Sequence, residues 1–183
     1  MDGNFYNDLR SPFVTADIAS VTLAATNKAL YPASAVPAMG KDYWWVGKKV
    51  RIEAFGRITT AVTPGNLTLA LFYGTGADAN GVSVCASAAQ TLVASQTNIS
   101  WRLQLTVHCR SVGSTGTLFG TGEAQFGAAV IAASGFLIPA SAAAASASVD
   151  LTVAGNVLSL QALRSGSTAE TMQIHDLSVI ALN

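Results

Sequence analysis

The chain has 183 residues, of which 50% are hydrophobic and 11% charged, and its ten basic and ten acidic side chains cancel. This length corresponds to about one domain, since domains run to about 100–200 residues. Without a surplus of Lys and Arg, nucleic-acid wrapping and binding to anionic membranes are excluded. High apolarity with low charge is also the opposite of a disordered composition. So few charges protect poorly against association, which predicts a surface covered by copies of the chain or by a partner.

The chain shows no targeting or membrane signal. Residues 1–8 are acidic and polar and do not resemble a secretory signal peptide. Residues 124–149 carry no charge, but they are mostly Ala, Ser and Gly and include Pro139, so we expect no transmembrane helix there. Cys85 and Cys109 fit a reducing site of synthesis, and we expect two inert thiols, Cys109 in the core, rather than a disulfide.

Short segments with a period of two dominate the chain. Residues 1–16 are polar with isolated aromatics and no such period, so we expect an N-terminal arm followed by one domain over residues 17–183. The strands that we expect are residues 20–25, 50–58, 67–71, 82–86, 90–94, 99–109, 116–126, 149–153, 157–163 and 172–182. About nine or ten short strands without a convincing amphipathic helix predict an all-β fold, an antiparallel sandwich or barrel.

Local signals refine these strands. The cleanest alternation runs from Ile99 to Cys109 and indicates a strand with one buried face. Gly56 predicts a bulge or bend, and residues 63–66 (TPGN) predict a type II turn. Residues 149–163 predict a second hairpin, which turns at residues 154–156. In the last strand the apolar phase changes near His175, which predicts an extra residue and therefore a β-bulge.

Titratable groups suited to catalysis are scarce. His108 lies on the polar side of its strand, which favours an exposed or interface residue over a catalytic one. His175 and Asp176 are neighbours in a strand and point to opposite faces, so they cannot pair unless a bulge redirects one of them. Residues 78–81 (DANG) resemble the start of a calcium loop without its closing Glu, and a local turn is favoured. We expect no enzyme and no catalytic, cofactor-binding or metal-binding residues.

One aromatic cluster stands out, formed by Tyr43, Trp44 and Trp45 at the entry to a strand. In an extended segment Tyr43 and Trp45 share one face and Trp44 takes the other. Burial in the core and over a sheet edge is the favoured interpretation. The alternative is an exposed surface for a partner protein or a sugar ring, because Trp and Tyr anchor interfaces.

Five runs carry a resemblance: KALYP (28–32), WVGKKVRI (45–52), TPGNLTL (63–69), NISWRL (98–103) and CRSVG (109–113). Their strand-and-turn texture resembles the β-sandwich head-decoration (cement) proteins and minor virion structural proteins of tailed bacteriophages. The likeness covers roughly residues 20–126 and contains no diagnostic motif. It implies a jelly-roll-like domain, commonly trimeric, that sits on a capsid shell and has no catalytic residues. The Ala/Ser-rich residues 127–148 depart from this pattern, and their role stays open.

Two functions follow as hypotheses. The first is a decoration protein on the capsid surface of the virion, made in the bacterial cytoplasm, with the major capsid protein and itself as partners in a homotrimer. The second is a tail- or fibre-associated module that recognises a carbohydrate or receptor through Tyr43, Trp44 or Trp45. Neither needs a cofactor, nucleic acid or membrane. In the arm, Phe5, Tyr6 and Phe13 are expected to order only against a partner, because an isolated arm cannot bury enough apolar surface.

Overall fold

A computed structural model describes residues 16–127, 130–140, 145–146, 148–166 and 169–183. It confirms the expected fold class: the protein is an antiparallel β-sandwich with 52% strand and 2% helix. The described residues form eleven strands, slightly more than the nine or ten expected, because residues 28–29 and 135–138 form strands that were not expected, while residues 149–153 form none. Phe5, Tyr6 and Phe13 of the expected arm lie outside the described residues.

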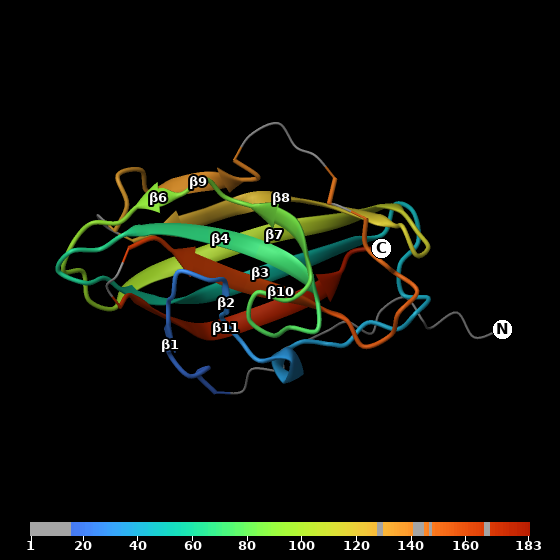
Figure 1. Ribbon diagram of the computed structural model, residues 1–183, viewed down its shortest axis with the longest axis horizontal. Coiled ribbons are helices and arrows are strands. Elements are labelled where there is room, and N and C mark those ends of the chain that lie inside the picture. The colour runs from blue at the N-terminus through green and yellow to red at the C-terminus, as the bar shows by residue number, and fades with distance from the viewer. Residues whose placement is uncertain (1–15, 128–129, 141–144, 147, 167–168) are drawn as a thin grey trace.

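Two sheets make up the sandwich, and Figure 1 shows their long strands overlapping as two layers. The six-stranded sheet has the order β1 (Val21–Thr22), β11 (Thr171–Ala181), β3 (Lys49–Thr59), β7 (Ile99–Ser111), β8 (Thr117–Phe126) and β9 (Gly135–Ile138). The other has the order β2 (Lys28–Ala29), β10 (Val157–Arg164), β4 (Asn66–Gly74) and β5 (Val82–Ala86), and β6 (Gln90–Thr91) also pairs with β4. A 3-10 turn, η1 (Ala33–Ala35), lies between β2 and β3.

The core lies between the sheets and follows the predicted alternation. In β7, Trp101, Leu103 and Leu105 are buried, while the intervening polar residues point away from the core. β3 and β4 bury alternate residues in the same way. The side of the six-stranded sheet that points away from the core is called here the outer sheet face.

Both cysteines are free and buried, so the core contains one more thiol than expected. The extra one is Cys85, because the β4–β5 pairing shifts register between Leu71 and Phe72 and turns both Val84 and Cys85 inward. Burial raises the pKa of the Cys85 thiol to about 12 and also raises the pKa of Cys109. Both groups are therefore thiols rather than thiolates near neutral pH, which is the inert state.

The five-stranded sheet is covered on both sides around β10, where residues 157–162 are all buried. On the side away from the core, the Gln161 amide accepts a hydrogen bond from the Ala79 N–H (3.1 Å) and donates one to the Ala77 carbonyl (3.1 Å). A loop thus closes over β10. None of the described segments covers the central strands of the outer sheet face in the same way, and polar residues are exposed there.

Two sequence predictions about turns were wrong. Gly65 lacks the positive φ that a type II turn requires. A glycine is needed there because a Cβ would lie 1.5 Å from the Ser165 carbonyl oxygen. The predicted hairpin before β10 is also missing, since Val149 forms only an isolated bridge to Gly116. The Val149 N–H donates to the Gly116 carbonyl (2.9 Å), which ties this segment to the turn before β8.

The predicted bulge in the last strand is confirmed. The β3–β11 pairing shifts register between Ile174 and Asp176, so His175 is the extra residue. Gly56 pairs with Ile174 next to this irregularity, so the predicted bulge or bend coincides with a bulge whose extra residue belongs to β11. A Cβ at Gly56 would lie 1.9 Å from the Gln173 carbonyl oxygen, so close packing of β11 explains the glycine.

Candidate functional site

The aromatic cluster lies in the turns before β3 rather than at the entry to a strand, since β3 begins at Lys49. Trp44 is buried in the core, where its indole N–H donates to the Tyr73 hydroxyl (3.2 Å). Its ring also makes edge contacts with Tyr43, at 5.2 Å between centroids, and with Tyr73, at 6.0 Å. Burial, the favoured interpretation, therefore holds for Trp44, and Tyr43 and Trp45 remain half-buried.

The faces of Tyr43 and Trp45 are occupied by a side chain of this same chain. The Lys48 Nζ atom lies 4.0 Å from the Tyr43 ring centre and 3.6 Å from the Trp45 ring centre. Lys48 is only 2% exposed, and this burial lowers the pKa of its ammonium to about 8. The electron-rich ring faces favour the charged form and oppose that shift. A sugar could not stack on these two faces without displacing Lys48.

The end of the sandwich that contains this cluster carries exposed apolar side chains. Val46, Val112 and Val153 are 63%, 47% and 48% exposed, and they come from three different loops. We call the surface formed by Val46, Val112 and Val153 the valine end. Because single exposed apolar residues are common but groups of them mark interaction sites, their shared location is the informative feature.

Backbone hydrogen bonds join the loops of the valine end. The Gly47 N–H donates to the Cys109 carbonyl at the end of β7 (2.9 Å). The Leu151 N–H donates to the Gly113 carbonyl in the turn after β7 (3.0 Å). These bonds hold the loops against one another, so the valines are presented by a hydrogen-bonded framework.

The two histidines make different contacts. His108 lies on the outer sheet face, with its ring 6.2 Å from that of Phe119. Its pKa is lowered by burial and then by the nearby charges of Lys49 and Arg110. At the bulge, the His175 Nδ1 atom lies 2.7 Å from the Asp17 carboxylate.

His175 therefore pairs with Asp17 at the start of the described chain and not with Asp176. The two neighbouring side chains stay apart, as the sequence predicted for them in a strand.

The loop that resembles a calcium-binding segment has a structural role. The Asp78 carboxylate accepts hydrogen bonds from the Lys28 ammonium (2.6 Å) and from the Ala29 N–H (2.8 Å). The Asn80 side chain accepts from the Thr75 N–H (3.2 Å). Within the described part of the chain, no group of three or more His, Cys, Asp or Glu side chains could hold a metal ion. Nor do these residues contain a helix that could cross a membrane.

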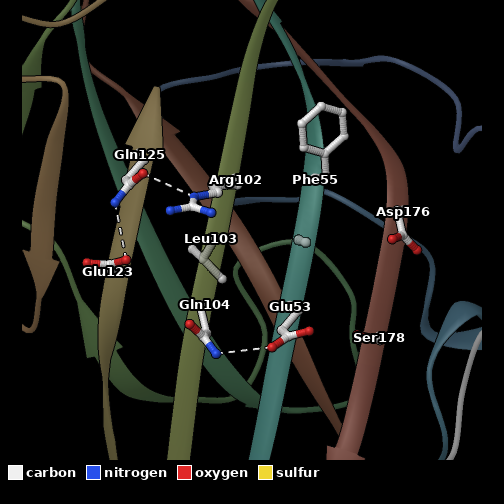
Figure 2. A pocket seen from close by; sticks show the side chains of 10 residues that line it. Glu53, Phe55, Arg102, Leu103, Gln104, Glu123, Gln125, Asp176 and Ser178 are labelled. Carbon is white, nitrogen blue, oxygen red and sulfur yellow. Dashed lines mark hydrogen bonds between the residues drawn. The ribbon is translucent and has the colours of Figure 1, made fainter. Parts of the chain in front are cut away.

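The feature that sequence reasoning missed is a hollow of about 300 Å³ on the outer sheet face. It crosses four strands, β8, β7, β3 and β11, and Figure 2 shows the side chains that line it. Its side-chain lining comes mainly from two cross-strand rows: Gln125, Arg102, Phe55 and Asp176 in one, and Glu123, Gln104, Glu53 and Ser178 in the other.

Hydrogen bonds link these polar side chains across the strands (Figure 2). The Arg102 Nε donates to the Gln125 amide oxygen (3.1 Å), and the Gln125 Nε2 donates to the Glu123 carboxylate (3.2 Å). The Gln104 Nε2 donates to the Glu53 carboxylate (3.0 Å). These contacts orient planar amide, carboxylate and guanidinium groups before any ligand arrives. The outward phase of each strand was visible in the sequence, but the rows depend on register between strands that are distant in the chain.

Comparison with protein-family models, with curated proteins and with solved structures finds no match for this chain.

Proposed function

We propose that the protein is a structural virion protein of a tailed bacteriophage, a decoration protein that binds the major capsid protein on the outside of the head as a homotrimer. The single observation that carries the proposal is the valine end, an apolar surface on a chain of very low charge. The resemblance of residues 20–126 to decoration proteins supports the same assignment.

The physical argument begins with the exposed valines. Burial of apolar surface is favourable by about 25 cal/mol per Å², so a partner that covers Val46, Val112 and Val153 gains from removing them from water. With 11% charged residues, the chain offers little electrostatic opposition to such contact. A rigid loop framework also loses little conformational freedom on binding. The valine end suits the symmetric packing of three copies on a shell.

The mechanical role follows from mass action. A protein that binds only the assembled shell stabilises the bound state and leaves the free subunits unchanged. Heads without the protein should therefore assemble and then release DNA at a lower temperature than decorated heads. Equal release temperatures would contradict the proposal.

The copy number in purified virions separates the two hypotheses. Quantitative mass spectrometry with isotope-labelled peptides should find copies in a fixed ratio to the major capsid protein, as expected for a protein spread over the whole shell. A copy number that matches a tail component would instead favour the tail- or fibre-associated module. Absence of the chain from the virion would overturn both.

Substitution tests the attachment surface. The triple variant V46S/V112S/V153S should lose binding to undecorated heads and sediment as a monomer. The matched control is V62S/V93S, because Val62 and Val93 are also exposed, at 78% and 40%, but lie near the opposite end of β3 and β4. Full binding by the triple variant would show that the contact lies elsewhere.

The arm supplies the second part of the proposal. We expect Phe5, Tyr6 and Phe13 to occupy pockets between subunits, where each ring could bury about 150–250 Å². Deletion of residues 1–15 should leave the sandwich folded and weaken attachment to heads. Unchanged affinity of the truncated protein would remove the arm from the binding surface.

A further inference from the structure

The hollow on the outer sheet face is separate from the valine end. Its volume, about 300 Å³, is at the lower limit of about 300–1,000 Å³ for small-ligand pockets. The strands that carry it are central in the six-stranded sheet, where neighbours on both sides hold their backbone positions. A binding site on central strands is more precisely shaped than one on loops.

A second hollow of about 230 Å³ extends the first along the sheet. Both are lined by Phe55, Arg102 and Gln125, so they form one groove rather than two separate sites. Phe55 is 43% exposed on the central strand β3, although large aromatic side chains normally avoid such exposure. A ligand that lies along the groove must contact its ring.

The groove combines an aromatic ring with planar polar groups. Gln104 and Gln125 offer both amide donors and carbonyl acceptors, and the Arg102 guanidinium offers donors in a fixed plane. The Glu53 carboxylate accepts from Gln104 through Oε1, and each carboxylate oxygen has a further lone pair for a ligand. A ligand that complements this surface has an apolar face and, along its edge, groups that both donate and accept hydrogen bonds. Sugar rings have that character, with hydroxyls at the rim and C–H groups on the face.

The charge of the lining narrows the class of ligand. Three carboxylates, from Glu53, Glu123 and Asp176, and one guanidinium, from Arg102, line the hollow, and Arg51 beside it forms an ion pair with Glu53 (3.6 Å), so the formal charge of the lining and this neighbour together is −1. Among the described residues, Asp176 takes part in no ion pair that would neutralise it. An anionic polysaccharide or a phosphate would be repelled. The strands beneath the hollow already use their backbone groups in the sheet, so a peptide could not join by strand addition.

From these observations we infer that the groove binds a neutral glycan, with one sugar ring stacked on Phe55 and its hydroxyls hydrogen-bonded to Gln104, Glu53 and Gln125. The carbohydrate site thus lies on the outer sheet face and not on the Tyr43–Trp45 cluster, whose rings are already in contact with Lys48. On a virion attached through the valine end, this face would be free to meet sugars of a cell surface.

The test uses the full chain and does not depend on virions. The purified protein is applied to immobilised neutral oligosaccharides of glucose, galactose, mannose, xylose and N-acetylglucosamine, with polygalacturonate as the anionic comparison. Binders are then titrated by calorimetry. We expect saturable binding to at least one neutral oligosaccharide and none to polygalacturonate. In a ¹⁵N-labelled sample, the same oligosaccharide should shift amide signals of β3, β7 and β8.

Two variants and a matched control locate the site. Phe55→Ala should weaken binding by about tenfold or more, because it removes the stacking surface. Gln104→Ala should weaken it by about three- to tenfold through loss of a hydrogen bond. The control is Phe119→Ala, which removes an aromatic ring from the same sheet face outside the groove, where it contacts Arg110.

Three results would overturn the inference. One is no saturable binding to any neutral oligosaccharide up to about 10 mM. Another is unchanged affinity in the folded Phe55→Ala variant. The third is binding to polygalacturonate alone that salt abolishes, which would identify a simple electrostatic contact.

Discussion

The Nζ atom of Lys48 lies 3.6 Å above the ring of Trp45, and this lysine is almost completely buried. A lysine in such a position is unusual, because burial of an ammonium requires compensation. The aromatic faces supply part of it. The contact makes this motif a structural part of the end of the sandwich, in line with the favoured interpretation of burial and against the alternative of an exposed recognition surface.

Stability should depend on pH through Lys48. Its folded pKa of about 8 is below the ordinary value of 10.5, so between these two pH values the unfolded chain binds more protons. The free energy of unfolding therefore gains a contribution that rises with pH across this window. We expect the difference between wild type and Lys48→Met, measured by urea unfolding, to shift in favour of wild type from about pH 7 to about pH 10.

The control for this prediction is Lys49→Met, the next residue, which is exposed at the start of β3. This variant removes an exposed ammonium and shows how much of the effect comes from the loss of one positive charge alone. A pH-independent difference for Lys48→Met would show that its ammonium is solvated in the folded protein.

Tyr31 should contribute measurably to stability through its hydroxyl. The hydroxyl donates to the Leu158 carbonyl (2.8 Å) and accepts from the Leu160 N–H (2.9 Å), and the ring is buried. Tyr31→Phe leaves both backbone groups without this partner, so the free energy of unfolding should fall by about 1–3 kcal/mol. Burial also raises the pKa of Tyr31, so stability should decrease as the pH rises above about 10, where the unfolded chain loses this proton first.

Tyr43→Phe is the matched control, because the Tyr43 hydroxyl is enclosed without a hydrogen-bond partner among the described residues. Removal of an unsatisfied hydroxyl should leave the urea midpoint unchanged or raise it. Equal destabilisation by both substitutions would contradict the assigned role of the Tyr31 hydroxyl.

Gly122 in β8 should tolerate no side chain. A Cβ at this position would lie 1.9 Å from the Gln104 carbonyl oxygen of the neighbouring strand. Gly122→Ala must therefore move β7 or β8, and we expect a loss of about 1–3 kcal/mol or more, measured by thermal or urea unfolding. Gly40→Ala is the control, because a Cβ there meets nothing within 4 Å, and it should leave stability within about 0.5 kcal/mol of wild type.

Breaking the ion pair between Arg164 and Glu170 should cost far more stability than breaking the exposed pair between Lys28 and Asp78. Glu170 is fully buried, its Oε2 lies 3.4 Å from the Arg164 Nε, and its Oε1 accepts from the Gly65 N–H (3.2 Å). Glu170→Ala should cost about 3–5 kcal/mol, since it leaves a guanidinium largely buried without this partner. Lys28→Met should cost at most about 1 kcal/mol. Similar losses in urea unfolding would show that the buried pair is solvated.

The features that could be predicted from the sequence are those encoded by neighbours in the chain. The alternation from Ile99 to Cys109 determined which side chains of β7 enter the core, because successive residues of a strand point to opposite faces. The phase change before Leu177 likewise located the bulge at His175. The all-β class followed from the repetition of such segments.

The failures have a common origin in contacts between distant segments. Gly65 was interpreted as a turn glycine, but the residue that excludes a side chain is Ser165, one hundred positions later in the chain. Residues 149–153 have the alternation of a strand, yet their backbone groups bind the turn before β8. No local pattern distinguishes these cases, because the competing partner is brought close only by folding.

The sequence by itself determined the antiparallel all-β class, the buried phase of the strands and the scarcity of charge. Only the tertiary structure decided where the remaining polar groups meet. Register between β8, β7, β3 and β11 brings Gln125, Arg102, Phe55 and Asp176 into one row, and loop packing places Lys48 between two aromatic rings. The physical reason is that the period of a strand specifies a face, whereas the neighbours on that face depend on long-range pairing and on the packing of the whole core.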